Sequence, residues 1–233
     1  MAFVMNNRQE LILDIIIKEY IETAAPVSSN FLVEKYQLDI SSATVRNEMA
    51  ELENNGYIMQ PHTSAGRIPT VIAYQWFVDK IEPKKIPAKL ADKLCFDSLS
   101  DETALKNLAK NLAEASGLAV FWAFHRHNLF YTGVSNFLSQ PEFAQNNLIY
   151  DMAVIIDKLD EIINDSFDDF NYGPAIKLGA DCLFGPFTAS TVTKYKLGDH
   201  IGVFGIIGPL RQDYEKNWQL TNYIYEKISS LQN

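Results

Sequence analysis

Two short stretches in the first third of the chain have the composition of a surface that binds nucleic acid. The stretch SSATVRNEM, residues 41–49, places an arginine beside an asparagine, Arg46 and Asn47. Arginine can form two hydrogen bonds with guanine, and asparagine can form two with adenine. The stretch HTSAGR, residues 62–67, supplies turn residues and a second arginine, which suits contact with phosphates or with the minor groove. Together they predict a site that reads double-stranded DNA.

Two helices are expected to precede this site. Apolar residues at helical spacing predict a first helix over residues 7–22. Ser28 can cap a short second helix, SNFLVEKY, and the spacing predicts that Phe31, Leu32 and Tyr36 face inward.

A third helix would carry the arginine and the asparagine. Ser41 or Ser42 can cap it, and Val45, Met49 and Leu52 share one of its faces, which predicts the buried side. The sequences YIMQ and RIPT can then form a two-stranded flap around PHTSAG. Three helices followed by such a flap is the order of a winged helix-turn-helix, whose third helix enters the major groove of DNA. The pattern predicts this domain over residues 1–82.

The charge of the chain opposes this interpretation. The formal net charge is −9 and the pI is about 4.9, which argues against non-specific coating of nucleic acid. Glu48, Glu51 and Glu53 lie on the proposed reading helix itself. A helix in the groove tolerates them only if they point to the core or away from phosphate. A protein-interaction module of the same shape is therefore an alternative.

The rest of the chain predicts helices packed on an antiparallel sheet, so the fold class is α+β. Residues 83–99 are expected to be a linker, whose lysines could touch the DNA backbone although a solvated linker explains them as well. Residues 101–116 predict a helix closed by Gly117. The strands LAVFWAF and NLFYTGV suit a hairpin, one or two helices are expected over residues 141–163, and AIKLG, FTASTVTKYKL and HIGVFGII predict three further strands. Residues 211–231 predict a final helix.

Catalytic, metal and cofactor sites are not expected, and no enzyme is predicted. His125 and His127 alternate and could begin a metal site, but no carboxylate or cysteine stands at supporting spacing.

The cysteines and the apolar runs predict a cytoplasmic protein. Cys95 and Cys182 fit no metal spacing, and reduced thiols explain them best. No apolar run approaches the roughly 20 residues that a membrane helix needs. The N-terminus does not have the pattern of a signal peptide.

Beyond these patterns, the segment PVSSNFLVEKYQLDISSATVRNEMAELENNGYIMQPHTSAGRIPT closely resembles the DNA-binding domain of the HrcA family of heat-inducible transcription repressors. Two later segments, GVSNFLSQPEF and IGVFGIIGPLRQDYEKNWQLTNYIYEKIS, resemble later parts of the same family. The resemblance implies a repressor of chaperone operons that binds as a homodimer to the inverted-repeat operator CIRCE and depends on the chaperonin. It also implies a GAF-like regulatory domain over residues 100–233. The DNA-binding residues it implies are Ser41, Ser42, Thr44, Arg46 and Asn47 on the helix, and His62, Thr63, Ser64 and Arg67 on the wing.

The chain departs from this family at one point. Family members carry a dimerising insertion within the GAF-like domain, whereas here only residues 125–128 separate LAVFWAF from LFYTGV. A palindromic target needs two subunits related by a two-fold axis, so we expect dimerisation through the final helix or the exposed sheet.

A GAF-like domain could instead sense a small molecule, which is a second alternative. The candidate lining residues are Phe121, Trp122, Phe124, Phe130 and Tyr131, although aromatic residues on strands more often form ordinary core.

Overall fold

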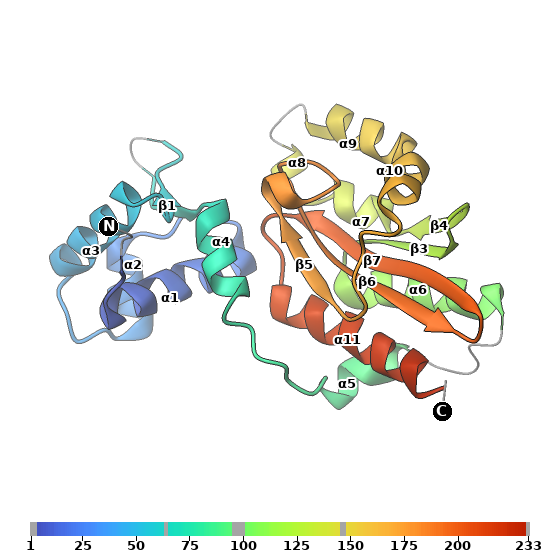
Figure 1. Cartoon of the computed structure of the whole chain (residues 1–233). Coiled ribbons are helices and arrows are strands. Elements are labelled where there is room, and N and C mark those ends of the chain that lie inside the picture. Colours follow the sequence, from blue (N-terminus) through green and yellow to red (C-terminus); the bar gives the residue numbers. More distant parts are fainter. Residues whose placement is uncertain (1–3, 63–64, 95–100, 145–147, 232–233) are drawn as a thin grey trace. The chain divides into compact units, whose positions relative to one another are not determined.

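The computed structural model describes residues 4–62, 65–94, 101–144 and 148–231. Helices combine with two separate antiparallel sheets, so the predicted α+β class is confirmed. The chain divides into two compact units, Met1–Ile81 and Glu82–Asn233 (Figure 1). None of the described helices is long and apolar enough to cross a membrane.

In its described residues the first unit contains four helices and a small hairpin, and the first three helices begin where the sequence predicts. The side chains of Ser28 and Ser41 accept hydrogen bonds from backbone N–H groups and cap the second and third helices. The elements are α1 (Asn7–Thr23), α2 (Ser29–Tyr36), α3 (Ser42–Asn54), β1 (Ile58–Met59), β2 (Ile68–Pro69) and α4 (Val71–Val78). Apolar side chains of α1, α2, α3 and α4 form one buried core between them.

The predicted inward face of α2 is wrong for two of its three residues. Leu32 is fully buried, but Phe31 and Tyr36 are 39% and 37% exposed. The ammonium group of Lys35 lies 5.4 Å and 5.7 Å from the centres of these two rings. A helix of eight residues buries only a narrow stripe, and the two aromatic residues flank a cation at its edge instead.

The second unit is a five-stranded antiparallel sheet covered by helices on both faces. Its helices are α5 (Ala88–Ala91), η1 (Asp92–Leu94), α6 (Glu102–Ser116), α7 (Val134–Leu138), α8 (Pro141–Ala144), α9 (Leu148–Asp157), α10 (Leu159–Ser166), η2 (Gly179–Asp181) and α11 (Tyr214–Ser230). Its strands are β3 (Ala119–His125), β4 (Asn128–Thr132), β5 (Ala175–Leu178), β6 (Thr188–Leu197) and β7 (His200–Pro209), in the order β4-β3-β7-β6-β5. The predicted hairpin and the three later strands are therefore confirmed.

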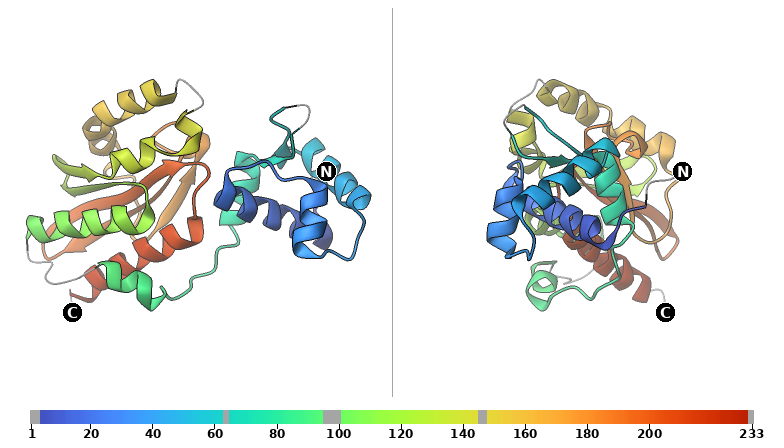
Figure 2. Two further views of the ribbon diagram at one scale, coloured as in Figure 1. Left: turned by 180° about the vertical axis from the view of Figure 1, so that it is seen from behind. Right: turned by 90° about the vertical axis from the view of Figure 1, so that its left-hand side faces the viewer.

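Helices lie on both faces of this sheet, as Figure 2 shows, and each face has its own core. Trp122, Tyr195 and Phe204 pack with α6 and α11 on one face. Phe121 and Val203 pack with α7 and α10 on the other. Because β3 lies between two other strands and helices cover both faces of the sheet, its sequence is a continuous apolar run rather than an alternating one.

Two segments of this unit differ from expectation. Three helices, α8, α9 and α10, occupy the region where one or two are predicted, and Lys158 alone separates α9 from α10. The segment expected as a linker, residues 83–99, contains α5 and η1, and Leu94 is fully buried in the core beneath α6. Cys95 lies outside the described residues, and Cys182 is a buried free thiol.

Candidate nucleic-acid interface

The third helix is fixed to the first unit by one face and presents the opposite face to solvent. Val45, Met49 and Leu52 are at most 5% exposed, which confirms the predicted buried side. Arg46 and Asn47 are both exposed. The helix therefore places its arginine and asparagine side by side on an accessible surface.

The start of α3 is held by its own serine and threonine. The Oγ of Ser41 accepts the backbone N–H of Thr44 at 3.1 Å and lies 3.0 Å from the Thr44 hydroxyl. Ser42 is half-buried. The Ser41 side chain thereby caps the first turn of the helix.

Each glutamate of α3 that opposes DNA binding has a partner within the same unit. Arg8 Nη1 lies 3.0 Å from Glu48 Oε1, and Gln9 Nε2 donates to Glu51 Oε2 over 2.6 Å. Arg67 Nη2 lies 2.8 Å from Glu53 Oε2. Two elements, α1 and the segment before β2, thus engage the acidic side chains of the helix.

The hairpin that follows α3 is anchored at its base. β1 and β2 pair through Ile58 with Pro69 and Met59 with Ile68. Arg67 exchanges two backbone hydrogen bonds with Val27, in the segment before α2, over 2.8 Å and 2.9 Å. The hairpin is therefore bonded to a segment forty residues earlier in the chain.

The hairpin residues predicted to contact DNA differ in their exposure to solvent. His62 is exposed, whereas Thr63 and Ser64 lie outside the described residues. Arg67 is half-buried and paired with Glu53. Sequence reasoning did not identify the partners Arg8 and Gln9, because pairs separated by some forty positions leave no local pattern.

A buried carboxylate joins α1 to the C-terminal end of α2. Glu19 is 2% exposed and accepts hydrogen bonds from the Lys35 ammonium and the Tyr36 hydroxyl. Burial alone would raise the pKa of Glu19, but the hydrogen bonds from Lys35 and Tyr36 hold that pKa below its ordinary value. Burial and the bond to Glu19 raise the pKa of Tyr36 to about 12. This cluster fixes α2, and with it the turn that leads into α3.

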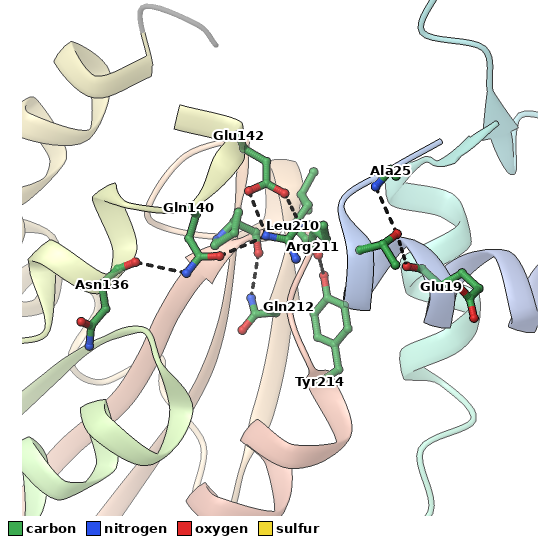
Figure 3. A network of polar contacts seen from close by, with 11 residues as sticks. Glu19, Ala25, Asn136, Gln140, Glu142, Leu210, Arg211, Gln212 and Tyr214 are labelled. Atoms are coloured by element: carbon green, nitrogen blue, oxygen red, sulfur yellow. Dashed lines mark hydrogen bonds and ion pairs between the residues drawn. The ribbon is translucent and has the colours of Figure 1, made fainter. Parts of the chain in front are cut away.

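In the second unit, a polar network fixes the turn between β7 and α11 (Figure 3). The guanidinium of Arg211 pairs with Glu142 and donates to the side-chain oxygen of Gln140. Gln212 donates to two backbone carbonyls, and Asn217 donates to the side-chain oxygen of Gln212. These polar groups form hydrogen bonds and an ion pair with one another and with the backbone, which indicates a structural role.

The aromatic residues considered for a ligand pocket do not gather around one cavity. Register pairs Phe121 with Tyr131 and Trp122 with Phe130, so neighbouring pairs alternate between the two faces of the sheet. Trp122 stacks on the ring of Phe204 at 4.4 Å. The apolar cavity beside Phe121 and Tyr131 has a volume of about 30 Å³, room for no more than a few water molecules. This arrangement is that of ordinary core.

No group of three or more His, Cys, Asp or Glu among the described residues could hold a metal ion. The ring Nδ1 of His125 accepts the backbone N–H of His127 at 3.3 Å, which orients that ring within the β3–β4 turn.

Comparison with known proteins finds relatives that are named as heat-inducible transcription repressors. The chain is 44% identical over 119 residues to "Heat-inducible transcription repressor HrcA" of Anabaena sp. (strain L31), covering 48% of this chain and 33% of that protein. It is 52% identical over 80 residues to the protein of the same name from Carboxydothermus hydrogenoformans, covering 34% of this chain and 24% of the relative. The matched stretches thus span a third or less of these relatives.

A solved structure shares the fold along nearly the whole chain. It is described as the crystal structure of a hypothetical protein, with a TM-score of 0.81, 20% identity and 98% coverage of both chains. The family description "HrcA protein C terminal domain" matches residues 75–217, which is more than half of the chain. The chain therefore belongs to the HrcA family.

Proposed function

We propose that this protein is a DNA-binding transcription repressor of heat-shock genes. In this proposal, residues 1–82 are a winged helix-turn-helix and residues 100–233 are a GAF-like regulatory domain. One observation carries the proposal above the others. The three glutamates of α3 are all engaged by Arg8, Gln9 and Arg67, while Arg46 and Asn47 stay exposed.

The ion pairs of Glu48 and Glu53 weaken the main objection to a DNA-reading helix. An unpaired carboxylate facing a phosphate backbone would repel it, and the net charge of −9 makes the whole chain acidic. Glu48 and Glu53, each paired with an arginine, present a much weaker negative field, whereas Glu51 is hydrogen-bonded to a neutral amide and keeps its charge. Arg46 and Asn47 remain exposed on α3 and can contact bases.

In this proposal some residues contact bases and others contact the DNA backbone, as in other winged helix-turn-helix proteins. Arg46 pairs with guanine and Asn47 with adenine in the major groove. Ser41, Ser42 and Thr44 flank the bases or bind phosphate at the start of the helix. On the wing, the proposed contact residues are His62, Thr63, Ser64 and Arg67.

The resemblance to HrcA supplies the target and the partners of this proposal. The operator is the inverted repeat CIRCE, the protein binds as a homodimer, and heat and the chaperonin modulate its activity. The β3–β4 connection consists of Arg126 and His127 alone, so it cannot hold a dimerising domain. Dimerisation would use α11 or an exposed part of the sheet.

Fluorescence anisotropy on two DNA duplexes tests the proposal directly. One duplex carries the chaperone-operon inverted repeat and the other a scrambled sequence, each measured at two salt concentrations with and without chaperonin. Preferential binding to the repeat, with two chains per duplex, is the expected result. Equal affinity for both duplexes in the presence of chaperonin would favour the protein-interaction module instead.

A further inference from the structure

Arg67 is the charged residue at the base of the hairpin, and its side chain is turned toward the protein. Its Nε and Nη2 lie 3.0 Å and 2.8 Å from the same carboxylate oxygen, Oε2 of Glu53. Only 22% of the Arg67 side chain is exposed. Arg46 on α3, in contrast, is exposed.

The backbone at Arg67 is held as firmly as the side chain. Its N–H donates to the Val27 carbonyl, and its own carbonyl accepts the Val27 N–H. At the neighbouring Gly66, a Cβ atom would lie 2.4 Å from the carbonyl carbon and oxygen of Val27, so only glycine permits this approach. The base of the hairpin is therefore bonded to the segment before α2 and to the end of α3 at once.

We propose that Arg67 is a positioning residue: through Glu53 it fixes the hairpin against α3, and it does not itself contact DNA. This inference rests on the proposed function and refines one of its assignments. Apart from Arg67, residues 57–69 contain no lysine, arginine, aspartate or glutamate. With Arg67 paired, the hairpin brings no free lysine or arginine to the DNA, and it acts by shape and by hydrogen bonds from residues such as His62.

Leaving the pair to reach a phosphate would gain little. Arg67 would expose the Glu53 carboxylate on the helix that enters the groove, and that carboxylate would repel the same backbone. It would also release the side-chain bond that joins the hairpin to α3. An intact pair keeps Glu53 neutralised and the hairpin in place.

The test measures binding of the 233-residue chain to the inverted-repeat duplex over a series of salt concentrations. The variants are Arg67→Gln, Glu53→Gln and the exchange Glu53→Arg with Arg67→Glu. We expect each single variant to weaken operator binding by about tenfold, the effect of breaking one coupled charge pair. The dependence on salt should stay unchanged, because no phosphate contact is lost. The exchange should restore most of the affinity.

If Arg67 contacts DNA directly, the variants should change operator binding differently. Glu53→Gln would then strengthen binding by removing a negative charge, and Arg67→Gln would lower the slope of log K against log salt by about one. The exchange variant would bind worst, since it places a carboxylate at a phosphate. Any of these three results would overturn the inference.

Arg8→Gln is the matched control. The substitution removes one positive charge and leaves one α3 glutamate, Glu48, without its partner. The natural Arg8 joins α3 to α1 and not to the hairpin. Arg67→Gln should therefore weaken operator binding more than Arg8→Gln does. Equal losses would mean that freeing a glutamate explains the effect, and the inference would fail.

Hydrogen exchange without DNA separates this inference from the proposed function. The Val27 and Arg67 amides should exchange faster in Arg67→Gln and Glu53→Gln than in the natural chain or in Arg8→Gln. Unchanged exchange in both hairpin variants would overturn the positioning role, whatever the DNA result. A natural chain that ignores the operator sequence would refute the proposed function while leaving the exchange result to stand.

Discussion

The indole N–H of Trp122 donates to the hydroxyl of Tyr195 over 2.8 Å, in the core between the sheet and helices α6 and α11. Both residues are at most 2% exposed, and burial raises the pKa of Tyr195. Gly202, opposite Tyr195 on β7, makes this contact possible, because a Cβ there would lie 2.4 Å from the tyrosine hydroxyl.

Tyr195→Phe removes the acceptor and leaves the Trp122 N–H buried without a partner. The free energy of unfolding should fall by ~1–3 kcal/mol, the cost of an unsatisfied buried donor. Urea unfolding followed by tryptophan fluorescence measures it. Tyr131→Phe serves as the control, because Tyr131 is 45% exposed and should change stability little. Equal losses in both variants would contradict the prediction.

Thr191→Val should stabilise the protein. Thr191 is fully buried on β6, and its hydroxyl has no hydrogen-bond partner in the part of the chain that the structure describes. Replacing this hydroxyl by a methyl group of similar size should raise the free energy of unfolding by about 1 kcal/mol.

Thr188→Val is the matched change for that experiment. The Thr188 hydroxyl, on the same strand, donates to the Gly185 carbonyl at 2.7 Å. Its replacement should lower stability where the first raises it. Thermal unfolding that moves both variants in one direction would show that the unpaired hydroxyl is not the cause.

Arg46→Ala tests the reading surface of α3. Because Arg46 is exposed, its removal should leave thermal unfolding unchanged. On the proposed function it should cost ~1–3 kcal/mol of specific operator binding and relax the preference at one base pair. Anisotropy with a panel of single-base operator variants measures this. Lys18→Ala, on α1, is a control of like charge that should affect binding weakly.

The carboxylate of Glu19 should make the first unit sensitive to acid. Its folded-state pKa lies below the ordinary value of 4.5, so the protein gains stability from it above that pH and loses this gain as the pH falls through the folded value. Glu19→Gln should lower stability at neutral pH and flatten its decline below pH 4.5. Equilibrium unfolding from neutral to acid pH measures both, and a parallel decline in the two proteins would contradict the assignment.

The hydroxyl of Tyr36 should make the stability of the first unit depend on pH in the alkaline range. Its pKa is raised from 10.0 to about 12, so the folded state binds its proton more tightly than the unfolded state does. The resulting stability is complete below pH 10 and is lost as the pH rises through about 12. Ultraviolet titration should find a phenolate with a midpoint near 12 that Tyr36→Phe removes and Tyr195→Phe does not. A difference spectrum with an ordinary midpoint would contradict the raised pKa.

Local signals in the sequence predicted most of the secondary structure correctly. The caps Ser28 and Ser41 lie where expected, and Gly117 closes α6 with a positive φ of 73°. Strand boundaries followed from apolar runs and turn residues, since both are set by neighbours in the chain.

Contacts between distant segments could not be predicted in this way. The side-chain pairing of Glu48, Glu51 and Glu53 depends on partners that lie up to forty-two positions away in the sequence. The orientation of Phe31 and Tyr36 depends on Lys35 and Glu19, which belong to two different helices. The short helix α7 has too few residues for its periodicity to stand out. Tertiary packing decides all of these, and a local window does not contain it.

The turn between β3 and β4 has a consequence for how this protein family can evolve. His125 and Asn128 face each other across the turn, and Val120 pairs with Thr132 at the other end of the two strands. Inserted sequence whose own ends lie close together can enter or leave at Arg126 and His127 without shifting the strand register. A whole domain can therefore be gained or lost at this turn while the sheet and the helices on its two faces keep their arrangement.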